Sequence, residues 1–214
     1  MMSPVFSRKL PGLMPGARRF AGGFTVIELM LAVVILAIIV ALGAPGLMSF
    51  VTQSRMTGQI NDILADVSLA RNEAASRGVR VAICASNNST TATPTCSGTD
   101  WNAGRIVFVD VDGSGQRNTA ANSTELLLKT SPALTGGSTI AVTLSTGGSS
   151  TTGPAMIQFR PYGGMATNGQ TTLAGSSTIL SKAVFTLCPV NTGKDGRVMT
   201  IAMTGRPVIS RVGC

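Results

Sequence analysis

The sequence predicts an α+β fold, in which a long bipartite N-terminal helix, transmembrane and then amphipathic, packs on a C-terminal antiparallel β-rich head. Three observations favour this class. No charged residue occurs from Leu29 to Val51, a length that spans a bilayer as a helix. From Ile60 to Ala74, apolar residues recur at helical spacing. The rest of the chain has short apolar runs separated by Gly, Ser, Thr and Asn, a pattern typical of strands joined by loops.

The charges before the apolar segment indicate how it is oriented. Arg8, Lys9, Arg18 and Arg19 precede it, and no acidic residue accompanies them. Positive charge is retained on the cytoplasmic side of a membrane segment, so we expect a cytoplasmic N-terminus, a single crossing and a head outside. An ordinary secretory signal fits poorly, because its cleavage site would follow the apolar segment, whereas the small residues at Gly22–Gly23 precede it.

Glu28 is an acidic residue near the start of the apolar segment. A charge at the centre of a membrane helix costs about 2.5–3.5 kcal/mol on insertion scales, and less near a helix end. A carboxylate in the first turn also favours the helix dipole. A cut between Gly23 and Phe24 would place a new α-amino group about one turn away, either in the same chain or in a neighbouring subunit, where the pair would set an axial register. The alternative is a simple membrane anchor with a tolerated glutamate.

The stretch GFTVIEL at Gly23–Leu29 resembles the class III signal of type IV pilins and type II secretion pseudopilins. The resemblance implies that the prepilin peptidase removes residues 1–23 by cutting after Gly23, that Phe24 is N-methylated, and that Glu28 pairs with the N-terminus as the subunit joins a filament. It also implies that residues 24–51 form a helix first in the bacterial inner membrane and then in the core of a pilus or pseudopilus.

A cluster of helix-weakening residues follows the apolar segment. Gly43, Pro45 and Gly46 stand there. Proline removes one backbone hydrogen bond and glycine weakens its neighbours. We therefore expect a kink or a melted turn at this place.

A second, amphipathic helix is expected over residues 52–78, with Gly78 as its C-terminal stop. Its predicted apolar face consists of Ile60, Ile63, Leu64, Val67, Ala70 and Ala74. Its predicted polar face consists of Asn61, Asp62, Asp66, Asn72 and Glu73. Such a helix lays one face on a globular domain.

Residues 79–214 are expected to form the β-rich head, which would be periplasmic. The candidate strands are Val79–Ala85, Arg105–Val111, Glu125–Lys129, Thr139–Leu144, Ala155–Arg160, Ile179–Leu187, Arg197–Met203 and Pro207–Val212. The polar stretch Ser145–Gly153 is expected to be a loop and the most mobile part of the head. Trp101 is the only Trp, and we expect it in the core rather than in a binding site.

All four cysteines, Cys84, Cys96, Cys188 and Cys214, follow the membrane segment. Four cysteines permit three pairings. A zinc site is the rival interpretation, but the spacing lacks paired ligands and the chain has no His. An oxidising periplasm favours disulfides. We predict a Cys84–Cys96 bond that closes a short loop, and a Cys188–Cys214 bond that ties the last residue to a strand.

The stretch DVDGSG at Asp110–Gly115 is similar to the opening of a calcium loop. An EF-hand would need a later acidic ligand; Asn122 stands where it would be sought, and Glu125 lies further along. A hairpin turn at Asp112-Gly113 explains the stretch as well or better. We therefore expect no metal and no other cofactor.

Signatures of catalysis are missing from the sequence. The chain has no His, the commonest general base. It also has no Gly-x-Ser-x-Gly elbow, no Walker loop and no Cys-x-x-Cys motif. We expect no catalytic residue and no enzymatic activity.

Basic residues predominate at the C-terminal end. From residue 182 onward a single acid, Asp195, accompanies five basic residues, which are Lys182, Lys194, Arg197, Arg206 and Arg211. The three arginines could contact phosphates of a nucleic acid. A solvated basic surface is the alternative.

Motifs in the head resemble the GspH/FimT/FimU group of minor pilins and pseudopilins. They are VRVAIC from residue 79, W-x-x-G-R-I-V-F-V-D from residue 101, Phe-Arg-Pro-x-Gly from residue 159 and Gly205-Arg206. Some FimT members bind DNA during natural transformation through a C-terminal Gly-Arg-x-Arg. Here Arg206 matches the first arginine, Val208 replaces the second, and Arg211 is the nearest substitute.

Together these resemblances imply a minor pilin or pseudopilin, a structural subunit that takes part in the assembly of a type IV pilus or a type II secretion pseudopilus, near its tip. The implied partners are other major and minor pilins or pseudopilins, the prepilin peptidase/N-methyltransferase and the inner membrane. Two alternatives stay open. One is a GspH-type pseudopilin for protein secretion, and the other is a DNA-binding minor pilin whose further partner is double-stranded DNA.

Overall fold

The computed structural model describes residues 23–146, 149–152, 156–168, 177–190 and 193–214. The chain forms two compact units, Met1–Pro45 and Gly46–Cys214. The second unit contains the head together with the later turns of the N-terminal helix. The leader up to residue 22, with the four basic residues that predict membrane orientation, lies outside the described residues.

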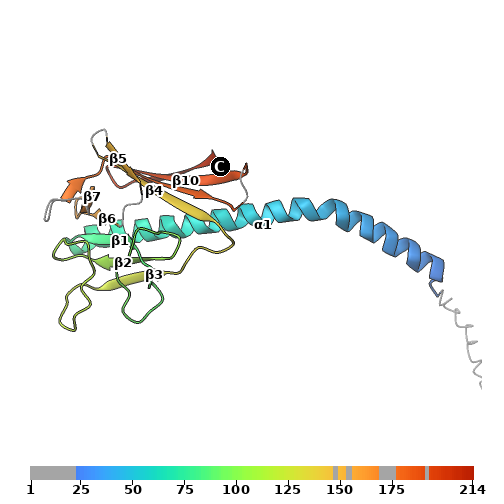
Figure 1. Cartoon of the computed structure of the whole chain (residues 1–214), viewed down its shortest axis with the longest axis horizontal. Helices are drawn as coiled ribbons and strands as arrows, with labels where there is room; N and C mark the ends of the chain where they lie inside the picture. The colour runs from blue at the N-terminus through green and yellow to red at the C-terminus, as the bar shows by residue number, and fades with distance from the viewer. Residues whose placement is uncertain (1–22, 147–148, 153–155, 169–176, 191–192) are drawn as a thin grey trace, which may run out of the picture. The chain divides into compact units, whose positions relative to one another are not determined.

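One helix, α1, runs from Val26 to Arg77 (Figure 1). It is helical through Gly43–Gly46, so of the two expected outcomes the melted turn is wrong, and the kink stays a prediction. Proline removes only one backbone hydrogen bond, and the turns on both sides keep theirs. The helix ends as predicted at Gly78, which has a φ of 68° and donates its N–H to the carbonyl of Ala74 at 3.1 Å. Glycine adopts this left-handed conformation without a steric cost.

The described part of the head is built from antiparallel strands (Figure 1). They are β1 Val81–Ala85, β2 Arg105–Val109, β3 Leu127–Ser131, β4 Thr139–Thr146, β5 Ser149–Thr152, β6 Met156–Phe159, β7 Met165–Asn168, β8 Ser177–Ile179, β9 Lys182–Cys188, β10 Asp195–Ala202 and β11 Pro207–Gly213. One sheet has the order β3-β2-β1-β6-β7-β8, and the other has the order β11-β10-β9-β4-β5. The predicted α+β class with an antiparallel head is confirmed.

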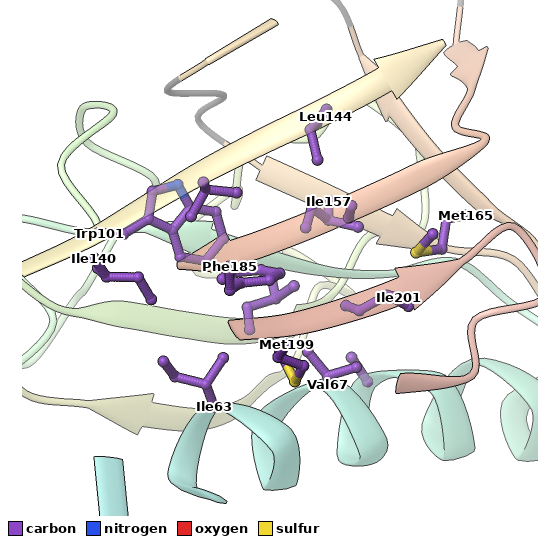
Figure 2. Close-up of a cluster of buried hydrophobic side chains, with 14 of the residues drawn as sticks. Ile63, Val67, Trp101, Ile140, Leu144, Ile157, Met165, Phe185, Met199 and Ile201 are labelled. Atoms are coloured by element: carbon purple, nitrogen blue, oxygen red, sulfur yellow. The ribbon is translucent and has the colours of Figure 1, made fainter. Parts of the chain in front are cut away.

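The main core lies where α1 meets both sheets, as Figure 2 shows. The helix contributes one buried stripe at spacings of three and four residues, which consists of Met56, Ile60, Ile63, Val67, Ala70 and Ala74. Trp101 is 3% exposed, and its ring meets Phe185 edge to face with centroids 5.4 Å apart. The core position predicted for this Trp is confirmed. Leu64 is only partly buried at the margin of the core.

Seven of the eight predicted strands are present with ends within two residues of the predicted ones. Ala155, the first residue of one prediction, lies outside the described residues. The eighth prediction, Ile179–Leu187, is wrong as a single strand. Residues up to Ile179 belong to β8 in the first sheet, and the chain passes through the buried Leu180 before β9 begins in the second sheet. No Gly or Pro marks this change of sheet, so an alternating pattern could not reveal it.

The polar stretch Ser145–Gly153, predicted to be a loop, is largely strand. Residues Ser145 and Thr146 continue β4, and Ser149–Thr152 form β5, an edge strand paired with it. The hydroxyls of Ser145 and Ser150 lie 3.2 Å apart across the pair. Thr has a high strand propensity, and cross-strand Ser and Thr pairs hydrogen-bond. Polar composition alone was therefore a poor guide to a loop here.

Candidate functional site

The first turn of α1 is organised by Thr25. Its Oγ1 accepts a hydrogen bond from the backbone N–H of Glu28 at 3.2 Å, and its carbonyl accepts from the N–H of Leu29 at 3.1 Å. Thr25 is therefore the N-cap, which satisfies a donor that has no partner within the helix. The sequence signal for this cap is Thr-x-x-Glu, the capping-box pattern. We did not predict this cap from the sequence. The cap starts the helix immediately after Gly23 and Phe24.

The membrane-length part of α1 presents apolar side chains on all sides. Val26–Gly43 has a mean hydropathy of 3.0, and none of this window is buried within the protein. Every large apolar residue described from Phe24 to Val51 is between 44% and 83% exposed. A helix that is apolar all round needs lipid or neighbouring apolar helices around it. By length and composition this part of α1 can cross a membrane.

The second part of α1 is joined to the head by a buried ionic contact. Asp66 is fully buried, and its carboxylate accepts hydrogen bonds from Nε of Arg105 at 2.5 Å and from the hydroxyl of Ser131 at 3.0 Å. Lys129 forms an ion pair with the same carboxylate. The prediction that Asp66 lies on the polar face is thus wrong. The helix turns Asp66 toward β2 and β3, and basic residues distant in sequence compensate its charge.

Two disulfides join the cysteines in the predicted pairs, Cys84–Cys96 and Cys188–Cys214. The second bond lies over Gly196 of β10, the strand between β9 and β11. A Cβ at this glycine would overlap Sγ of Cys214 and would lie 2.5 Å from the carbonyl oxygen of Leu187. The bond therefore passes where β10 has no side chain, and it ties the end of the chain to β9.

The three candidate DNA-binding arginines do not form one group. Arg197 lies directly opposite Arg211 on β10 and β11. One NH2 group of Arg197 donates to the hydroxyl of Thr57 on α1 at 3.4 Å. Arg206 is exposed in the turn before β11, five residues from Arg211. Since a strand rises about 3.3 Å per residue, about 17 Å separates their backbones.

The turn that carries Arg206 instead meets two other segments that contain an arginine. The preceding residue, Gly205, lies against the side chain of Arg71 from α1 and against the carbonyl of Gly163. Close by in sequence to Gly163, Arg160 donates to the hydroxyl of Tyr162 at 2.6 Å, and Tyr162 is 74% exposed. The N–H of Gly163 donates to the carbonyl of Arg160 at 2.9 Å, so the segments that carry Arg71, Arg160 and Arg206 meet around Gly163 and Gly205; we call these three arginines the arginine cluster. The sequence could not group these residues, since they come from three separate segments.

The predicted hairpin turn at Asp112-Gly113 is wrong. Strand β2 ends at Val109 and β3 begins only at Leu127, so no strand pair flanks these two residues directly. Instead, the long connection folds around carboxylates that accept backbone N–H groups. Asp110 and Asp112 come together there with Glu125, whereas Asn122 is exposed.

Two models of protein families match the sequence. Residues 59–205 match the family described as type II transport protein GspH. Residues 18–44 match the prokaryotic N-terminal methylation motif. The second match contains Gly23, Phe24 and Glu28. No curated protein matches the chain.

Among solved structures, the chain is similar to two crystal forms of the type IV minor pilin FimU of Pseudomonas aeruginosa strain PAO1. The first is 17% identical with a TM-score of 0.44, and the match covers 74% of this chain and 87% of FimU. The second is 18% identical with a TM-score of 0.43, and the match covers 74% of this chain and 91% of FimU.

Proposed function

The chain belongs to the GspH family of pilin-like proteins, and we propose that it is a minor subunit that assembles into a type IV pilus, at or near the tip. The observation that carries this proposal is the exposed apolar part of α1 directly after a methylation motif. A surface of this kind has to exchange lipid for the apolar helices of other subunits when a filament forms. The head then presents its two sheets outside the filament core.

We further propose that Gly23 is the last residue of a leader removed by the prepilin peptidase, and that Phe24 becomes the methylated N-terminus. Thr25 caps the helix, so the new amino group would lie beside the first turn, near the carboxylate of Glu28. A positive charge there, from the same chain or from a neighbour, would offset the cost of a carboxylate in an apolar medium. Glu28 would then fix the axial register of the subunit.

The membrane orientation supported by the charge pattern is a cytoplasmic N-terminus and a periplasmic head. The two disulfides of the head are consistent with an oxidising compartment. Protease added to spheroplasts should digest the head and spare the leader of an unprocessed Gly23→Ala precursor. Protection of the head under these conditions would contradict the orientation.

Assembly can be tested with Glu28→Leu, which keeps the helix apolar and removes the carboxylate. Filaments are sheared from cells that produce the full chain, and the subunit is quantified in the filament and membrane fractions. We expect cleavage before Phe24 and normal membrane insertion, with at least a tenfold loss from the filament fraction. Glu73→Gln is the matched control, because it removes a helix carboxylate that pairs with Arg77 on the head side.

Equal amounts of the Glu28→Leu and wild-type proteins in filaments would refute the role of Glu28. A mature N-terminus other than methylated Phe24, found by mass spectrometry, would refute the processing site. The same fractionation separates the two assembly alternatives. Recovery only with a secretion pseudopilus, and not with pili, would favour a GspH-type role in protein secretion.

DNA binding is a second candidate function, and the arginine cluster is the observation that favours it. Arg206 is exposed, and within the described residues it forms no ion pair with an acid. Such a group of guanidinium ions can bind the phosphates of double-stranded DNA. The departure at Val208 means that the second arginine would come from another segment, Arg71 or Arg160, rather than from β11.

The test is a titration of double-stranded DNA with the full chain in nonionic detergent over a salt series. We expect Arg206→Ala to weaken binding and to reduce the salt dependence by about one phosphate contact. Arg55→Ala is the control, because Arg55 is also exposed and contacts the carbonyl of Gly136 elsewhere on the head. No binding at low salt, or equal effects of the two variants, would remove this candidate.

A further inference from the structure

The connection between β2 and β3 brings three carboxylates together. One oxygen each from Asp110, Asp112 and Glu125 lies within 4.8 Å of the others. These are three of only nine acidic residues in a chain with a net charge of +8. Among the described residues, none of the ion pairs involves any of the three. The guanidinium of Arg80 lies against Gly113 of the same loop, but none of these ion pairs offsets the mutual repulsion of the three carboxylates.

The loop holds each carboxylate through one oxygen and leaves the other available. The N–H of Gly115 donates to Oδ2 of Asp110 at 3.1 Å, that of Ser114 to Oδ1 of Asp112 at 2.8 Å, and that of Asn118 to Oε2 of Glu125 at 2.5 Å. Oδ1 of Asp110 and Oε1 of Glu125 are buried and accept no hydrogen bond from any residue that the structure describes. A buried carboxylate oxygen without a partner is costly.

Gln158 supplies a separate observation from a different element, β6. Its side chain is fully buried, and Nε2 donates to Oδ2 of Asp110 and to the carbonyl of Gly113. Its Oε1 is buried and has no hydrogen-bond partner in the described part of the chain. The Nε2 end of the amide therefore faces the carboxylate group, and the buried oxygen Oε1 is unused. A half-turn of this amide would present Oε1 as an uncharged ligand.

We propose that Asp110, Asp112, Glu125 and Gln158 form a Ca²⁺ site that fastens the β2–β3 connection to the first sheet. Calcium binds six to eight oxygens at 2.3–2.6 Å, so opposite ligands lie about 4.6–5.2 Å apart. The three carboxylate oxygens, all within 4.8 Å of one another, are close enough together to bind one such ion. Mg²⁺ usually keeps several waters and is bound through one or two carboxylates, so a site of three carboxylates and an amide favours Ca²⁺. The exposed Asp112 leaves one side open for water ligands and for access of the ion.

The electrostatic environment agrees with this assignment. Burial raises the pKa of Asp110, and the neighbouring Asp112 raises it further. Burial likewise raises the pKa of Glu125, with added repulsion from the two aspartates. The hydrogen bond from Ser114 lowers the pKa of Asp112. A divalent cation would favour the ionised form of all three groups, so protons should compete with calcium.

The test is calorimetric titration of the full chain in nonionic detergent with CaCl₂, after removal of metal with a chelator. We expect one Ca²⁺ per chain and a rise in the melting temperature. Without calcium, Asp112→Asn should melt no lower than wild type, because it keeps the acceptor for Ser114 and removes one of the three repelling charges, yet it should bind calcium at least tenfold more weakly. Asp100→Asn is the control, since Asp100 is an exposed loop aspartate whose carboxylate accepts hydrogen bonds from Asn102.

A second variant separates a cation site from a structural role. Glu125→Gln keeps the acceptor for Asn118 and removes one buried charge, so it should melt higher than wild type without calcium and lose the calcium response. If Glu125 had only a structural role, the Glu125→Gln protein would melt at a lower temperature than wild type in the absence of calcium. No heat of binding at millimolar CaCl₂, equal affinity for Mg²⁺, or an unchanged calcium response in Asp112→Asn would overturn the proposal.

Discussion

The buried carboxylate of Asp66 should be the most sensitive single point of the contact between helix and head. Replacing it with Ala leaves Arg105, whose side chain is 5% exposed, as a buried charge without its acidic partner. Ser131 also loses its hydrogen-bond acceptor. Lys129 is 38% exposed and can turn to solvent, so it adds little to the cost.

The expected cost of Asp66→Ala follows from these contacts. Removal of one partner from a buried ion pair costs about 3–5 kcal/mol. For a folded unit of this size, about 2–4 °C is lost per kcal/mol. The melting temperature of the head should therefore fall by about 6–20 °C. Trp101 lies in the head core, and it is the only Trp of the chain, so its fluorescence reports unfolding of this unit alone.

The matched control is Asp62→Ala, one turn earlier on α1, where the side chain is exposed. An exposed residue without such contacts should change the free energy of unfolding by no more than about 0.5 kcal/mol. The double variant Asp66→Leu, Arg105→Met should recover part of the lost stability, because it leaves no unpaired buried charge. Equal melting temperatures for the Asp66→Ala and Asp62→Ala proteins would refute the reasoning.

Three further predictions concern the head. Gly196→Ala should destabilise it by about 1–3 kcal/mol, because a Cβ there overlaps Cys214, and proteolysis should release the last strand faster; unchanged proteolysis would contradict this. Reduction of both disulfides should lower the free energy of unfolding by about 6 kcal/mol, since loops of 12 and 26 residues are worth about 3 and 3.5 kcal/mol; a loss under 1 kcal/mol would argue against this. Without calcium, Asp110 and Glu125 have raised pKa values, so the native state holds protons more tightly than the unfolded chain does. The free energy of unfolding should therefore fall as the pH rises above the ordinary carboxyl range. Glu125→Gln should flatten this fall, and an unchanged dependence of stability on pH in the variant would contradict the prediction.

The sequence by itself determined the features that depend on neighbours along the chain. The segment from Gly23 to Val51 could be assigned because a processing motif and a continuous apolar stretch are local patterns. Strand positions followed from alternation within short windows. The pairing of Cys84 with Cys96 followed from their short separation. These features need no knowledge of how distant segments pack.

Only the tertiary structure decided which distant residues meet. Asp66 of α1 has the sequence position of a polar-face residue, and its burial depends on Arg105 of β2 and Lys129 of β3. The carboxylates of Asp110 and Glu125 are fifteen residues apart, and a looped connection brings them together. Such charges are stable inside a protein only when partners arrive from elsewhere, and helical or strand periodicity carries no information about partners far along the chain.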